Sequence, residues 1–196
     1  MKTNPNRDKH GPDFNALFDF ALAQEGNFTT AQAAIAGYSP QLIAKYLTNG
    51  RFIRVRRGIY RLVHFPAGEY EQLTAYWLWS FRQGVFSHQT ALVLHDLSNI
   101  MPNFASMTLP ASWRSRRLRI PPGLLLYYSD VPPADTFLIG PLPVTSVSRT
   151  LQDCMQEHIA PEFLFDALTQ AIESGQVNRG QLPEIEEYLA RFDHSR

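Results

Sequence analysis

Cysteine is nearly absent from this chain of 196 residues, in which Cys154 stands alone. A single cysteine excludes an intramolecular disulfide and a zinc site built mainly from thiolates. Apolar runs such as residues 124–128 are far shorter than the ~20 residues a helix needs to cross a bilayer. Residues 1–12 are polar and have no apolar segment typical of a signal peptide. We therefore expect a soluble, cytoplasmic protein with no membrane partner.

Acidic residues are missing from two long windows, residues 26–68 and residues 97–129. The basic residues in these windows are Lys45, Arg51, Arg54, Arg56, Arg57 and Arg61 in the first, and Arg114, Arg116, Arg117 and Arg119 in the second. Residues 130–196 balance them with eleven acidic residues against four arginines. This asymmetry indicates a nucleic acid as partner of the basic part. A solvated surface whose charges happen to cluster is the alternative.

Three helices and a hairpin are predicted at the start of the chain. Apolar residues at helical spacing predict a helix over 13–24. Thr29-x-x-Gln32 matches a capping box and begins a second, short helix. Ser39-Pro40 supplies an N-cap and a first-turn proline for a third helix over 40–48. Residues 51–63 change period and indicate two short strands with a basic turn, so the order is that of a winged helix-turn-helix.

The spacing of three small or apolar residues supports this assignment. A helix-turn-helix needs a small residue where its two helices cross and a turn residue that tolerates positive φ. Ala33 and Gly37 have these properties, and Ile43 falls where the third helix returns an apolar side chain to the core.

The exposed residues of the third helix and the wing are the candidate DNA contacts. In such modules the N-terminal part of the third helix enters the major groove. Gln41 has the amide that pairs with adenine, and Lys45 suits a guanine or a phosphate. Wing arginines contact phosphates or the minor groove. The complete candidate set is Ser39, Gln41, Lys45, Thr48, Asn49, Arg51, Arg54, Arg56, Arg57 and Arg61.

The rest of the chain predicts a larger mixed domain, which makes the fold class α+β. The expected organisation is a flexible tail over 1–12, a winged helix-turn-helix over 13–66 and an α+β domain over 69–196. Within the larger domain we expect helices over 70–82, 90–97, 146–156, 161–174 and 183–191, and strands over 106–109, 124–128 and 136–139.

The segment Trp113 to Arg119, with sequence WRSRRLR, is a candidate for a second basic surface. Its arginines are interleaved with the aromatic Trp113, as at surfaces that bind nucleic acids. An acidic partner protein, or the acidic C-terminal helices of this same chain, would satisfy the same charges. The sequence leaves these alternatives open.

No arrangement of residues predicts an enzyme, a metal site or a cofactor. His88 and His95 lie two helical turns apart but have no third ligand at a typical spacing. Cys154 and His158 have the spacing of a Cys–His pair, although an isolated cysteine on an apolar helix is more often buried. Phosphate-binding, dinucleotide and serine-hydrolase motifs do not occur.

Three segments together resemble a known family. They are FTTAQAAIAGYSPQLIAKYLTNGRFIRVRRGIYRL, VFSHQTALVLHDLS and PVTSVSRTLQDC. The chain resembles the AbiEi-type antitoxins of bacterial abortive-infection toxin–antitoxin systems over roughly residues 14–191. The resemblance implies a winged helix-turn-helix that binds the operator of its own operon as double-stranded DNA with inverted repeats, and represses it. It also implies a C-terminal domain that counters a nucleotidyltransferase-type toxin without a stable complex, as in type IV systems.

Two functions follow from this reading of the sequence. One is a DNA-binding antitoxin and autorepressor. The other is a winged-helix regulator whose C-terminal domain senses a ligand or a protein and has no toxin partner. A neighbouring gene for a nucleotidyltransferase would distinguish them.

Overall fold

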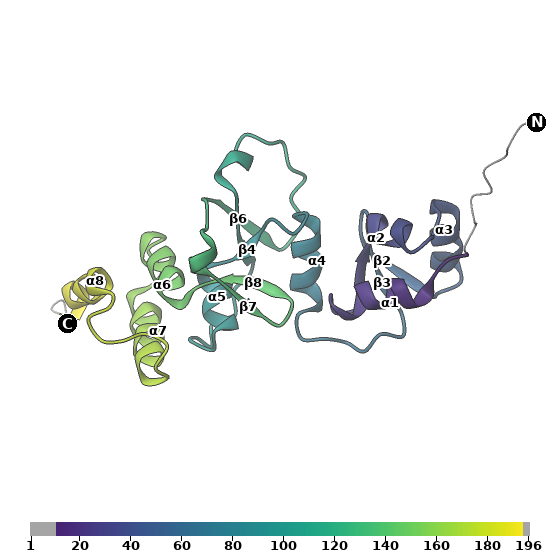
Figure 1. The fold of residues 1–196 in the computed structure, drawn as a ribbon. Coiled ribbons are helices and arrows are strands. Elements are labelled where there is room, and N and C mark those ends of the chain that lie inside the picture. The colour runs from purple at the N-terminus through teal and green to yellow at the C-terminus, as the bar shows by residue number, and fades with distance from the viewer. Residues whose placement is uncertain (1–10, 194–196) are drawn as a thin grey trace, which may run out of the picture. The chain divides into compact units, whose positions relative to one another are not determined.

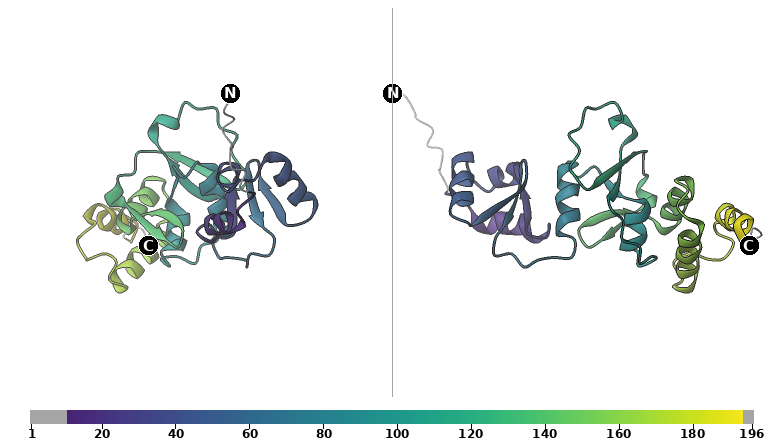
Figure 2. Two further views of the ribbon diagram at one scale, coloured as in Figure 1. Left: turned by 45° about the vertical axis from the view of Figure 1, so that its right-hand side comes forward. Right: turned by 180° about the vertical axis from the view of Figure 1, so that it is seen from behind.

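The computed structural model describes residues 11–193 (Figure 1 and Figure 2). Most of the tail expected over residues 1–12 therefore lies outside the described residues. The chain forms two compact units, of which the first ends at Trp79 and the second begins at Ser80. Both units combine helices with a sheet, so the α+β class predicted from the sequence is confirmed.

The first unit has the element order of a winged helix-turn-helix, which confirms this part of the predicted fold. Its elements are α1 (Phe14–Leu22), β1 (Asn27–Thr29), α2 (Thr30–Ile35), α3 (Pro40–Thr48), β2 (Phe52–Arg56), β3 (Ile59–Leu62) and α4 (Glu71–Trp79). The strands form an antiparallel sheet in the order β1-β3-β2. Helix α4, which the sequence analysis assigned to the larger domain, belongs to this unit.

Hydrogen bonds from local side chains cap the amino ends of α2 and α3 at the residues that the sequence indicated. The Gln32 amide donates to Thr29 Oγ1 at 3.2 Å, and the Thr29 amide donates to Gln32 Oε1 at 2.8 Å, which completes the capping box. The Leu42 amide donates to Ser39 Oγ at 3.2 Å at the start of α3. Gly37 links the two helices with φ of +81°, a left-handed conformation that favours glycine.

An aromatic core holds α3 against the sheet. Phe28 of β1 is fully buried and meets Phe52 of β2 edge-on, with ring centroids 4.9 Å apart. Tyr46 of α3 meets Phe52 in the same way at 5.0 Å. Ile43 of α3 is 3% exposed and Ala33 of α2 is 0% exposed, as expected of the residues where the two helices cross. This packing decides which face of α3 is left in solvent.

The second unit is built on a mixed five-stranded sheet in the order β6-β5-β4-β8-β7. Its elements are β4 (Val85–Phe86), α5 (His88–Leu94), β5 (Ala105–Leu109), the 3-10 turn η1 (Ala111–Trp113), β6 (Leu124–Tyr128), the 3-10 turn η2 (Pro133–Asp135), β7 (Thr136–Ile139), β8 (Leu142–Thr145), α6 (Val147–Gln156), α7 (Pro161–Glu173) and α8 (Pro183–Asp193). The pairs β5–β6 and β4–β8 are parallel, and the other two pairs are antiparallel. A buried apolar cluster joins α5 to α6, α7 and α8.

The sequence predicted most of the elements but not β1, β4 and β8. β1 and β4 have three and two residues, too few to show a period, and β8 has four. Pro143 lies inside β8, and proline has no N–H to donate to a neighbouring strand. It lies opposite Leu138 of β7, and on its other side β8 pairs with β4 only between Val144 and Phe86.

The packing of Ile43 gives a test of the first unit. Replacing Ile43 by Ala should destabilise this unit by about 2–4 kcal/mol, because the substitution leaves a cavity beneath α3. Ile35→Ala is the matched control, since Ile35 is 74% exposed, and should change stability by less than about 0.5 kcal/mol. Hydrogen–deuterium exchange of peptides from α3 and β3 measures both effects. Equal protection in the two variants would show that α3 does not depend on this core.

Candidate nucleic-acid interface

One face of α3 is left exposed by the packing of the helix. Gln41, Ala44, Lys45 and Thr48 are all exposed, and their spacing of three and four residues places them on one side of a helix. Leu42, Tyr46 and Leu47 are partly buried against the aromatic core on the other side. The exposed face thus combines an amide, a cation and a hydroxyl around a small residue. The sequence analysis did not single out Ala44, although the same helical spacing identifies it.

Some of the predicted contact residues form hydrogen bonds within α3 or at its ends. Ser39 Oγ accepts the amide of Leu42 as the N-cap, and Thr48 Oγ1 donates to the Ala44 carbonyl oxygen at 3.1 Å. Asn49 is exposed at the C-cap, where its backbone N–H donates to Lys45 O at 2.9 Å. Gln41 and Lys45 extend from the exposed face, and their side chains are the ones best placed to reach another molecule.

The hairpin formed by β2 and β3 follows α3, and hydrogen bonds to α2 hold its turn. Gly58 forms its turn with φ of +76°. The Gly58 carbonyl oxygen accepts the Thr30 amide at 3.0 Å and the Thr30 hydroxyl at 3.3 Å. The turn is therefore held at the first residue of α2. Arg57, beside Gly58, is exposed at this tip, and Arg54 is exposed along β2.

The remaining arginines of the first window differ in exposure. Arg51 is exposed, with its guanidinium 5.2 Å from the centroid of the Tyr46 ring. Arg56 is half-buried, and its guanidinium lies 4.4 Å from the centroid of the Tyr76 ring. A cation stacked in this way contributes to packing and is less available to a ligand than Arg54 or Arg57.

Arg61 departs from its expected place on the DNA-binding surface. It is 7% exposed, and its Nε lies 3.0 Å from Glu71 Oε2. Its Nη atoms donate to the carbonyl oxygens of Leu62, Phe65 and Pro66. These bonds join the end of the hairpin to α4, so Arg61 is a buried structural residue and leaves the set of candidate DNA contacts. The acid-free window misled the sequence analysis because the partner, Glu71, lies just beyond it.

The arginines of the second window lie on the loop that follows β5. Arg114, Arg116, Arg117 and Arg119 are all exposed, and we call residues 114–119 the arginine loop. Arg116 stacks on Trp113 with its guanidinium 4.1 Å from the ring centroid. Arg114 Nη2 donates to the Tyr128 carbonyl oxygen at 3.1 Å. These two contacts hold the guanidinium groups of Arg114 and Arg116 against the second unit. Arg117 and Arg119 are exposed beside them.

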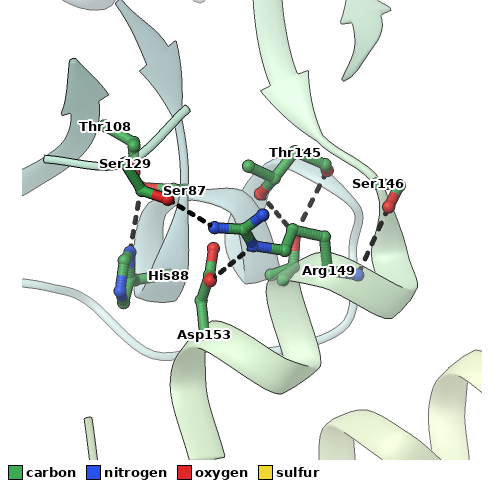
Figure 3. A network of polar contacts seen from close by, with 9 residues as sticks. Ser87, His88, Thr108, Ser129, Thr145, Ser146, Arg149 and Asp153 are labelled. Carbon is green, nitrogen blue, oxygen red and sulfur yellow. Dashed lines mark hydrogen bonds and ion pairs between the residues drawn. The ribbon is translucent and has the colours of Figure 1, made fainter. Parts of the chain in front are cut away.

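A second group of polar residues lies between the sheet and the helices of the second unit (Figure 3). This polar cluster consists of Ser87, His88, Thr108, Ser129, Thr145, Ser146, Arg149, Thr150 and Asp153. Arg149 is at its centre, because its Nε donates to Asp153 Oδ1 at 2.7 Å and its Nη2 donates to Ser129 Oγ at 3.2 Å. The cluster brings together the two segments SHQTAL and TSVSRTLQDC, which are far apart in the sequence.

Burial changes the protonation behaviour of the cluster. The His88 ring stacks on Tyr127 with centroids 3.5 Å apart, and its Nδ1 lies 2.9 Å from Ser87 Oγ. Burial, together with the charge of Arg149, lowers the pKa of His88 to about 4, so the ring is neutral near pH 7. Burial also raises the pKa of Asp153, which the hydrogen bond and charge of Arg149 partly oppose.

These contacts give the histidines and the cysteine structural roles. His95 Nε2 lies 2.7 Å from the Thr145 carbonyl oxygen, so His95 joins α5 to β8. Ser87 is fully buried and bonds Thr108, and does not cap α5 with its side chain. Burial raises the pKa of the Cys154 thiol far above its usual range, and His158 is exposed, so the two do not form a reactive pair.

Two further observations concern metal ions and membranes. Over residues 11–193, three or more His, Cys, Asp or Glu side chains never gather as they would around a metal ion. Across that same range, the helices are too short or too polar to span a membrane.

Comparison with known proteins finds a similarity over most of the first unit. Residues 15–63 match the family described as "Transcriptional regulator, AbiEi antitoxin". The matched range runs from α1 to just after β3 and so includes α3 and the wing. No curated protein matches the chain.

The neutral His88 predicts how the second unit responds to acid. Unfolded His takes up a proton near its ordinary pKa of about 6.5, whereas His88 in the folded chain does so only near pH 4. The unfolded state therefore binds more protons between these values, and stability falls by about 2–3 kcal/mol from pH 7 to pH 4.5. Hydrogen exchange of β5 amides, corrected for intrinsic rates, measures this loss.

The variant His88→Gln should lose this part of the pH dependence, while the exposed control His158→Gln should retain it. The carboxyl of Asp153 acts in the opposite direction, because its raised pKa favours the folded state as the pH falls. Comparing the two variants isolates the histidine. The same pH dependence in both would contradict the assignment of a buried neutral His88.

Proposed function

Because residues 15–63 match the AbiEi antitoxin transcriptional regulators, we propose that this chain is a sequence-specific DNA-binding antitoxin. It represses its own operon and counters a cognate nucleotidyltransferase-type toxin. The observation that carries the DNA-binding part is the exposed face of α3, where Gln41, Ala44 and Lys45 lie in a window without any acidic residue.

The chemistry of the α3 face suits the major groove. The Gln41 side chain can form two hydrogen bonds with adenine, and Lys45 can donate to guanine or to a phosphate. Ala44 between them lets the helix approach the base edges closely. The amino end of α3 is also the positive end of the helix dipole, which favours a phosphate. Gln41 is thus the proposed base-reading residue, and Lys45 contributes both affinity and specificity.

The wing supplies contacts that do not depend on sequence. Arg54 and Arg57 are exposed on β2 and at its turn, and guanidinium groups bind phosphate strongly. Arg51, beside the end of α3, extends the same basic surface. Ser39, Thr48 and Asn49 are exposed at the two ends of α3 and complete the proposed set. An operator of inverted repeats would place two copies about one helical turn of DNA apart, or a multiple of it.

The antitoxin part of the proposal concerns the second unit. It is supported by the resemblance of the segments that meet in the polar cluster, Ser87–Leu92 and Thr145–Cys154, to the AbiEi-type antitoxins. The proposed domain organisation is a winged helix-turn-helix followed by an α+β antitoxin domain. Neutralisation of the toxin is proposed to need no stable complex between the two proteins.

The wing arginines and Gln41 should have different effects on DNA binding. Arg54→Ala/Arg57→Ala should weaken binding to all duplexes and reduce the slope of log K against log salt by about 2, since each lost phosphate contact reduces it by about 0.9. Gln41→Ala should instead cost about 1–3 kcal/mol on the operator and little on an unrelated duplex. Fluorescence anisotropy with the chain's own promoter DNA at several salt concentrations measures both.

Arg179→Ala is the control, because Arg179 is an exposed arginine outside the proposed interface, and it should bind like wild type. If Arg54→Ala/Arg57→Ala keeps the wild-type affinity and salt slope, the wing is not the phosphate-binding surface. If Gln41→Ala weakens binding to the two duplexes equally, Gln41 does not read a base.

Co-expression tests the toxin-related part separately. The proposal expects a gene for a nucleotidyltransferase beside this one, and when that enzyme is induced, co-expression of the full chain should restore growth. Gln41→Ala should also restore it, because this substitution affects operator binding alone. Growth arrest despite normal levels of the full chain would favour a regulator that has no toxin partner. That outcome leaves the DNA-binding proposal intact.

A further inference from the structure

Helices α7 and α8 enclose a groove that the proposed function does not use. It has a volume of about 500 Å³ and lies wholly within the second unit. Its apolar lining includes Phe165, Leu168, Leu189 and Phe192. Phe165 is 58% exposed and Phe192 is 45% exposed. Large aromatic side chains exposed together are typical of a surface that another chain covers.

Carboxylates surround this apolar lining. Glu162, Asp166 and Glu186 all line the groove. Between residues 161 and 193 the chain has seven acidic residues against two arginines. A surface of this charge repels nucleic acids and attracts basic groups. The groove therefore suits a polypeptide segment that carries several cations next to an apolar side chain.

The arginine loop has this chemistry. Its four exposed arginines lie in a window without acidic residues, and Ile120, directly after it, is 47% exposed. The cations complement the carboxylates of the groove, and Ile120 complements its apolar lining. Within one copy, Arg114 and Arg116 contact Tyr128 and Trp113. Views of the second unit from different directions place the loop after β5 away from α7 and α8 (Figure 1 and Figure 2).

We propose that the α7–α8 groove of one copy binds the arginine loop of a second copy. The chain then self-associates through its second unit, without DNA. Each copy has one loop and one groove, so a pair in which each loop enters the other groove satisfies both at once and closes with two-fold symmetry. Solvent-exposed ion pairs are individually weak and are screened by salt, so the association is weak and depends on salt.

Charge reversal on the two surfaces tests this pairing. Sedimentation velocity of the full chain over a range of concentrations should show a dimer that weakens by about tenfold between low and high salt. Arg117→Glu/Arg119→Glu should weaken dimerisation by about tenfold, and so should Asp166→Arg/Glu186→Arg. An equimolar mixture of these two variants should form a heterodimer through the restored pair of opposite charges.

The matched control for the loop variant is Arg82→Glu/Arg179→Glu, which lowers the net charge by the same amount at exposed sites outside the loop and the groove. It should dimerise like wild type. Circular dichroism of every variant confirms that it is folded, and the mixture adds a check, because two misfolded variants would not restore association.

Three results would overturn the proposal. They are a wild-type chain that stays monomeric at all concentrations, a mixture that associates no better than either variant, and a control as weak as the loop variant. If Arg117→Glu/Arg119→Glu leaves association unchanged and weakens binding to an unrelated duplex, the loop is a nucleic-acid surface instead. Dimerisation is measured without DNA or toxin, so its failure does not affect the proposed function.

Discussion

Burial of one side of α3 is the constraint on which the proposed interface depends. Ile43 must face the core formed with Phe28 and Phe52, because an exposed isoleucine and the cavity beneath it would cost several kcal/mol in a small unit. Once Ile43 is fixed, the helical period turns Gln41, Ala44, Lys45 and Thr48 outward together. The aromatic core thus determines which residues of α3 can contact a ligand, although the core itself does not contact it.

The positive charge around this face depends on the absence of acidic residues as well as on the presence of arginines. The first unit keeps acidic side chains out of residues 26–68, so Arg54 and Arg57 stay available at the wing. Arg61, in the same window, is buried and paired with Glu71 on α4. Seven of the eleven acidic residues of the segment 130–196 lie instead on α7 and α8. A neutral protein can therefore present a cationic surface and an anionic groove.

The sequence predicted those features that depend on a few neighbouring residues. The capping box of Thr29, the N-cap of Ser39 and the turn at Gly37 are local, and each is present in the structure. β4 and β8 were missed because short strands exist only through pairing with distant residues. The burial of Arg61 and the placement of His88 and Arg149 in one cluster likewise depend on tertiary contacts. Only the spacing of Arg149 and Asp153, four residues apart on α6, could have hinted at the polar cluster.

The central claim is that α3 presents its Gln41–Thr48 face to DNA. NMR spectra of the full chain, titrated with a duplex from its own promoter, test this claim most directly. The account predicts that the largest shifts fall on Gln41, Ala44 and Lys45, with further shifts at Arg54 and Arg57 of the wing. Shifts that spare α3 and fall elsewhere in the chain, or no shifts at all, would contradict it.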